Sequence, residues 1–104
     1  MSRGPDVTTQ LERALLESAC AAACPLDLRA SEMKRWASAT FVGAKHLLTF
    51  AGEASPGLDA WLAALPDAEF ALRDHLVADL VVQSVRREDG AASVELEVLT
   101  VEER

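Results

Sequence analysis

The stretch LVVQSVRREDGAASVELEV, residues 80–98, decides the fold of this 104-residue chain. Two apolar runs, Leu80–Val82 and the alternating Val94–Val98, flank the dipeptide Asp89-Gly90. Asp-Gly is favoured in two-residue hairpin loops, because both central residues of such a turn take positive φ. We therefore predict two antiparallel strands joined at Asp89-Gly90.

The loop length sets which residues face each other across this hairpin. A loop of two residues places Val81 opposite Val98. It also places Val85 opposite Val94. A loop of three residues, closed by a glycine bulge, places Val82 opposite Val98 instead.

The segment before the turn, residues 70–87, fits two patterns. Its even positions from Phe70 to Val82 are apolar apart from Asp74, as in a strand. A helix capped by Asp67 would instead form the stripe Val77, Leu80, Val81 and Ser84. We prefer the strand, because it leads directly into the Asp-Gly turn.

Upstream, residues 9–24 predict a helix with an Ala-rich end. Thr9 and Glu12 have the spacing of a capping box, with Asp6 and Thr8 as alternative caps. Pro25 ends the helix, since it lacks the backbone donor that the helix needs.

The middle of the chain contains a less regular segment, a strand and a short helix. Residues 26–36 have a mixed pattern, with Ser31 a candidate cap for one short turn. Residues 37–50 favour a strand with a bulge at Gly43, where the apolar alternation changes phase. Ser55-Pro56 begins a helix that Pro66 closes.

These elements predict an α+β fold and a single domain over residues 1–104. Their order is helix-strand-helix-strand-strand, with a C-terminal antiparallel hairpin and the helices packed on the sheet. Half of the residues are apolar and 26% are charged, as in ordinary globular proteins.

Charge argues against two classes of partner. The chain carries a net charge of −7, and residues 51–104 hold twelve acidic and four basic side chains. Such a field repels phosphate groups, so we expect neither nucleic-acid binding nor association with anionic membranes.

The sequence also favours the cytoplasm. No apolar stretch approaches the length of a membrane span, and Glu17 interrupts the segment that most resembles a signal peptide. In that compartment Cys20 and Cys24 are expected to be reduced thiols.

The two cysteines are candidates for a zinc site. Cys20 and Cys24 are four residues apart, which on a helix places both thiols on one side. A closed zinc site needs two further ligands, and His46 and His75 have no motif spacing relative to the cysteines. We therefore expect small packing residues, and no metal or other cofactor.

Two histidines and a tryptophan are the remaining candidates for chemistry. His75 and Asp79 would share one face of a regular strand, where a carboxylate could orient an imidazole for acid–base catalysis. Trp36 and His46 are candidates for ligand binding. No nucleophile motif or phosphate-binding loop accompanies any of them, which argues against an enzyme.

The strand before the turn is apolar on both faces, since Val77, Val81 and Val85 alternate with the even-numbered set. A strand that is apolar on both faces is expected to be covered on both. We therefore predict an interaction module that forms a homodimer through the sheet, with these valines at the interface. The alternative is a small-molecule binder or minor enzyme with a pocket near His46 or His75.

Overall fold

The computed structural model describes residues 6–103. Within them two helices and a four-stranded antiparallel sheet follow in the order α-β-β-α-β-β, which confirms the α+β class and the C-terminal hairpin. The elements are α1 (Val7–Ala21), β1 (Leu26–Ala37), β2 (Val42–Glu53), α2 (Pro56–Ala64), the 3₁₀ turn η1 (Leu65–Asp67), β3 (His75–Glu88) and β4 (Ala91–Glu102).

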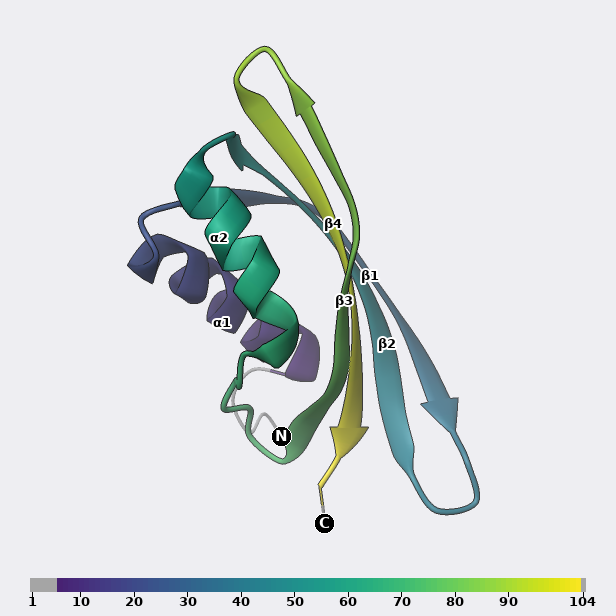
Figure 1. The fold of residues 1–104 in the computed structure, drawn as a ribbon. Helices are drawn as coiled ribbons and strands as arrows, with labels where there is room; N and C mark the ends of the chain where they lie inside the picture. Colours follow the sequence, from purple (N-terminus) through teal and green to yellow (C-terminus); the bar gives the residue numbers. More distant parts are fainter. Residues whose placement is uncertain (1–5, 104) are drawn as a thin grey trace.

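The sheet is long and twisted, and its strands lie in the order β1-β2-β4-β3. Both helices pack on the same face of it (Figure 1). No helix or strand of the described chain lies on the other face, which is called the open face below.

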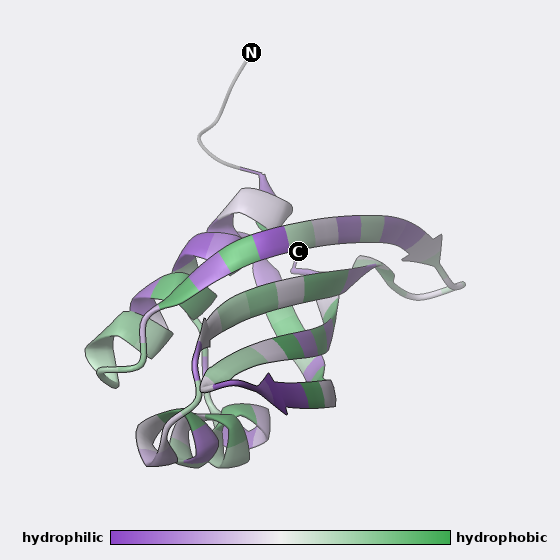
Figure 2. Cartoon of the chain, turned by 90° about the horizontal axis from the view of Figure 1, so that it is seen from above, coloured by the Kyte–Doolittle hydropathy of each residue, from purple (hydrophilic) through white to green (hydrophobic). Residues whose placement is uncertain are grey.

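β1 is a strand that the sequence pattern did not reveal. It pairs antiparallel with β2, from Leu26 opposite Gly52 to Ala37 opposite Val42. As an edge strand it is mostly exposed, with apolar and polar residues intermixed (Figure 2). A bulge between Leu28 and Ala30 breaks the apolar alternation that begins at Leu26. The expected turn capped by Ser31 is therefore wrong.

β2 is continuous through Gly43, and the predicted bulge there is wrong. The change of phase came from Phe41, which lies in the loop before the strand, where its amide donates to Ser38 Oγ at 3.0 Å. Gly43 instead lets the backbone of Thr100 and the ring of Trp36 lie close to β2. A Cβ there would lie 2.1 Å from the carbonyl oxygen of Thr100 and 2.7 Å from Cζ2 of Trp36.

The β3–β4 hairpin has the two-residue loop that its sequence favours. Asp89 and Gly90 have φ of 51° and 79°, as the turn requires. Val85 lies opposite Val94, as this loop predicts. A bulge between Val82 and Ser84 then shifts the register, so Leu80 and not Val81 faces Val98.

α1 begins with Asp6 as its cap. The side chain of Asp6 accepts a hydrogen bond from the amide of Thr9 at 2.9 Å. This bond holds the pKa of Asp6 below its usual value, because it favours the charged carboxylate. Asp6, an alternative cap in the sequence, is thus the cap, and the expected capping box of Thr9 and Glu12 is wrong.

α1 ends at Ala21, so Pro25 lies beyond the helix and is not the residue that ends it. Ala23 adopts a φ of 61°, and the amide of Cys24 donates to the carbonyl of Ala19 at 3.0 Å. This is the Schellman arrangement, in which a left-handed residue lets later amides satisfy the last helical carbonyls.

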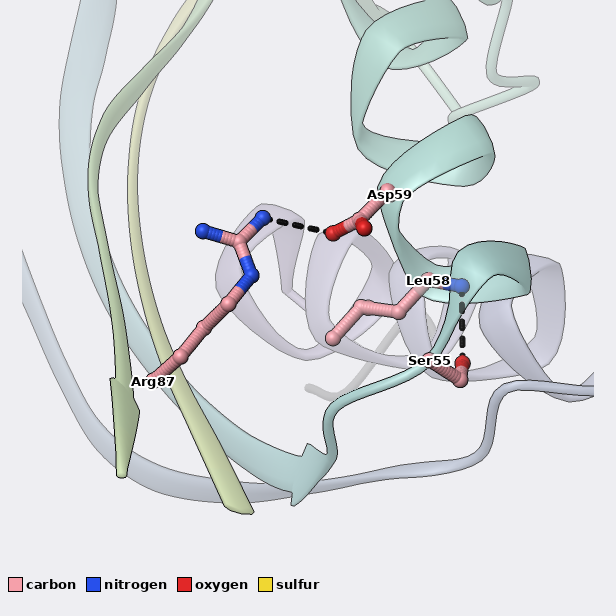
Figure 3. Close-up of polar contacts among 4 residues, drawn as sticks. All are labelled: Ser55, Leu58, Asp59 and Arg87. Carbon is pink, nitrogen blue, oxygen red and sulfur yellow. Dashed lines mark hydrogen bonds and ion pairs between the residues drawn. The ribbon is translucent and has the colours of Figure 1, made fainter. Parts of the chain in front are cut away.

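α2 begins as its sequence predicts, with Ser55 accepting from the amide of Leu58 at 3.0 Å (Figure 3). One turn further, Asp59 forms an ion pair with Arg87 of β3. This contact joins the helix to the sheet close to the β3–β4 turn.

The core lies between the helices and the sheet. Trp61 of α2 is buried in it, and its Nε1 donates to Ser18 of α1 at 2.9 Å. The largest side chains that are fully buried there include Leu11, Leu15, Leu48, Phe50, Leu58, Leu65, Val94, Leu96 and Val98.

Candidate protein-interaction surface

The open face is defined by the register of the four strands. In β2 and β4 the even-numbered residues from 44 to 50 and from 92 to 100 are buried on the helix side. Successive side chains of a strand point to opposite faces, so the odd-numbered residues lie on the open face.

Three adjacent rows across the sheet make up the centre of this face. Each row takes one residue from each strand, in the order β1, β2, β4, β3. The rows are Trp36, Gly43, Val101 and Leu76; then Lys34, Lys45, Leu99 and Asp79; then Glu32, Leu47, Glu97 and Val81.

The first row and the loop beside it expose large apolar side chains. Leu76 is 53% exposed, and Phe41 of the β1–β2 loop is 54% exposed. Together with Val101 they line a depression of ≈ 260 Å³. Val81, in the third row, is 41% exposed. Large apolar side chains gathered on one face are typical of an interaction site.

The middle of the open face is charged. Lys45 Nζ lies 3.5 Å from Glu97 Oε1, and Gln83 Nε2 donates to Glu97 Oε2 at 2.8 Å. The Lys45–Glu97 pair remains partly exposed, so it contributes little to the stability of the fold. Its charges remain accessible to a partner.

Trp36 lies at the β1 end of the first row, with its indole over Gly43. Its Nε1 is buried and has no hydrogen-bond acceptor among the described residues. With Lys34, Lys45 and Leu99 it lines a depression of ≈ 380 Å³. Trp36 is therefore part of the open face.

His46, the other candidate for ligand binding, lies on the helix face and is fully buried. Its Nε2 is 2.9 Å from Thr100 Oγ1, and the Thr100 hydroxyl donates to the carbonyl of Ala44 at 3.3 Å. Because that hydroxyl proton is used, His46 Nε2 donates and Nδ1 carries the lone pair, which has no partner among the described residues. Burial, followed by the nearby His75, lowers the pKa of His46.

His75 and Asp79 do not share a face. The register of β3 shifts between Val77 and Asp79, which places His75 on the helix side and Asp79 on the open face. His75 Nδ1 is 2.9 Å from the carbonyl oxygen of Arg73. The expected carboxylate–imidazole pair is therefore not formed.

The cavity that His75 lines is small, ≈ 30 Å³. That volume suits about one water molecule and lies far below the roughly 300 Å³ of a typical ligand pocket. It gives no support to a substrate site at His75.

The cysteines do not act as a pair. Cys20 is exposed on α1, whereas Cys24 follows the end of the helix and is buried. Burial raises the pKa of the Cys24 thiol, as expected for a packing residue. Among residues 6–103 no group of three or more His, Cys, Asp and Glu side chains is placed to hold a metal ion.

The three valines of the predicted interface lie on different faces. Val77 and Val85 pack against the core on the helix side, while Val81 lies on the open face. The two bulges of β3 separate them, because each bulge exchanges the faces.

Sequence reasoning missed Leu76, Leu99 and Lys34 as members of the open face. One signal was present in the last strand. Its odd positions change from Glu95 and Glu97 to Leu99 and Val101, which indicates that the solvent-facing side becomes apolar toward its end.

No helix in the described part of the chain is long and apolar enough to cross a membrane. No protein-family model, curated protein sequence or solved structure matches this chain. Function is therefore inferred from the geometry of the open face.

Proposed function

We propose that this protein is an interaction module that forms a homodimer through the open face of its sheet, in the cytoplasm. The observation that carries the proposal is the uncovered face itself. It exposes Leu76 and Val81 beside Leu47 and Leu99, while both helices pack on the other side. A two-fold pairing is the commonest way to bury such a face.

The size of the face suits a stable dimer. Strands of twelve to fourteen residues span about 40 Å, and four strands span about 19 Å, at the usual rise and spacing. The face therefore offers roughly 750 Å² to a partner. Stable interfaces of standard size bury about 800 Å² on each side.

The test is the mass in solution, by light scattering coupled to size exclusion at tens of micromolar. We expect the mass of two chains, and we expect Val81→Glu to give the mass of one chain without unfolding. The reason is that a dimer would bury two unpaired carboxylates in its interface. A wild-type mass of one chain that is unchanged on concentration would contradict the proposal.

Met33→Glu is the matched control. Met33 is 42% exposed, against 41% for Val81, and the substitution adds the same charge. Met33 lies opposite buried His46, on the side of the sheet that the helices cover. The proposal requires this variant to remain a dimer, and equal loss of the dimer in both variants would refute the assignment of the interface.

A further inference from the structure

The charges of the open face are segregated along its second row. Lys34 and Lys45 lie on β1 and β2, whereas Asp79 lies on β3 in the same row. Glu97 of β4 lies one row away, and Glu32 is the acidic residue of the β1–β2 half in these rows. Within these three rows, one half of the face thus presents both lysines and the other half presents two of the three carboxylates.

We infer that the two copies of the chain are related by a two-fold axis parallel to the strands, with Lys34 of each copy on Asp79 of the other. The inference rests on the proposed homodimer and adds its geometry. An axis parallel to the strands and one perpendicular to them bring different rows together.

An axis parallel to the strands exchanges the two edges of the sheet and leaves each row at its own height. β1 then faces β3 of the second copy, and β2 faces β4. Lys34 meets Asp79 twice, once on each side of the axis. In the adjacent row Trp36 meets Leu76, so aromatic and aliphatic side chains are buried together.

An axis in the plane of the face but perpendicular to the strands gives the opposite result. It places every strand over the same strand of the second copy, and it reverses the order of the rows. A row then faces itself only at the axis, and for the second row this sets Lys34 on Lys34 and Asp79 on Asp79. Like charges in direct opposition disfavour an axis at that row. An axis between the second and third rows sets Lys34 on Glu32, but it also sets the apolar first row on the row of Ala30, Thr49, Glu95 and Ser84, so Leu76 and Val101 lose their apolar partners.

Charge reversal at positions 34 and 79 tests the axis. Lys34→Glu and Asp79→Lys each create two like-charge contacts in their own homodimer, so we expect each to dimerise at least ten-fold more weakly than the wild type. An equimolar mixture restores opposite charges at both contacts. Native mass spectrometry of the mixture should show the heterodimer in large excess over either homodimer.

Two further variants control for other effects of charge. The double variant Lys34→Glu/Asp79→Lys should recover the homodimer, because both contacts again join opposite charges. Arg13→Glu makes the same change of charge on α1, on the helix side. Its mixture with Asp79→Lys should show no preference for the heterodimer.

Different results would refute the proposed axis and the proposed interface. A wild-type protein that is monomeric at all concentrations refutes both. Another result is a wild-type dimer that Val81→Glu splits, while the charge variants form homodimers and heterodimers in statistical proportions. That result refutes the axis but supports the interface. A dimer that survives Val81→Glu as well points to pairing through a strand edge and refutes both.

Discussion

Ala23 is a residue in a conformation that usually belongs to glycine. Its φ of 61° closes α1, and its side chain is exposed. An L-residue in this region costs roughly 1–2 kcal/mol relative to right-handed helical geometry, because its Cβ crowds the backbone. Glycine does not carry this cost, although it loses more freedom on folding.

We therefore expect Ala23→Gly to stabilise the protein by about 0.5–1 kcal/mol. Urea denaturation measures the change, and it should appear as a higher midpoint with an unchanged slope. Ala22→Gly is the control one residue earlier, where φ is −88°. It gains nothing from the backbone and should be neutral or destabilising.

His46 predicts how stability depends on pH. Its pKa is lowered in the folded state, chiefly by burial, so the unfolded chain binds a proton more readily. The contribution of His46 is complete above the unfolded pKa of about 6.5. It is lost as the pH falls from there through the lowered folded value.

The unfolding free energy should therefore decline as the pH falls below about 6.5. Urea titrations at several pH values measure this slope, and His46→Gln should reduce it because the neutral amide takes up no proton. Nearby charges also affect the pKa of His46: His75 lowers it, whereas the carboxylates of Glu12 and Asp6 raise it. An identical slope in His46→Gln would assign the effect to other groups.

At the scale of the elements, backbone conformation sets the cost of a side chain at Gly90 in the β3–β4 turn. A Cβ at Gly90 would meet no atom within 4 Å, yet φ is 79°. Gly90→Ala should therefore destabilise the protein by about 1–2 kcal/mol through the backbone and without a steric clash. Thermal or urea unfolding measures this cost.

Gly57→Ala serves as the matched control within α2. Gly57 is helical, and an added Cβ would make ordinary contacts of 3.7 and 3.9 Å. This variant should be neutral or slightly stabilising, since alanine has a higher helix propensity than glycine. Equal destabilisation at both positions would contradict the role of the turn.

At the scale of the whole molecule, dimerisation links stability to concentration. A partner that binds only the folded chain raises its stability by mass action. For a domain of this size we expect Tm to rise by roughly 3–6 °C for each ten-fold increase in protein concentration. Scanning calorimetry over two decades of concentration measures the dependence.

Val81→Glu should remove this dependence, whereas Met33→Glu should retain it. The comparison separates loss of the dimer from loss of the fold, because a monomeric variant still unfolds cooperatively at one Tm. A wild-type Tm that is independent of concentration would argue against the dimer.

Local patterns in the sequence determined the α+β class, α2 with its Ser55 cap and the hairpin at Asp89-Gly90. In each case residues adjacent in the chain satisfy one another, through a cap or a turn. The tertiary structure decided what depends on neighbours in space. β1 is a strand because β2 supplies its hydrogen bonds, although its sequence mixes apolar and polar residues without one continuous alternation. The bulges of β3 decided the candidate site, since each exchanges the faces and together they leave Val81 and Asp79 on the open face while His75 turns to the helix side.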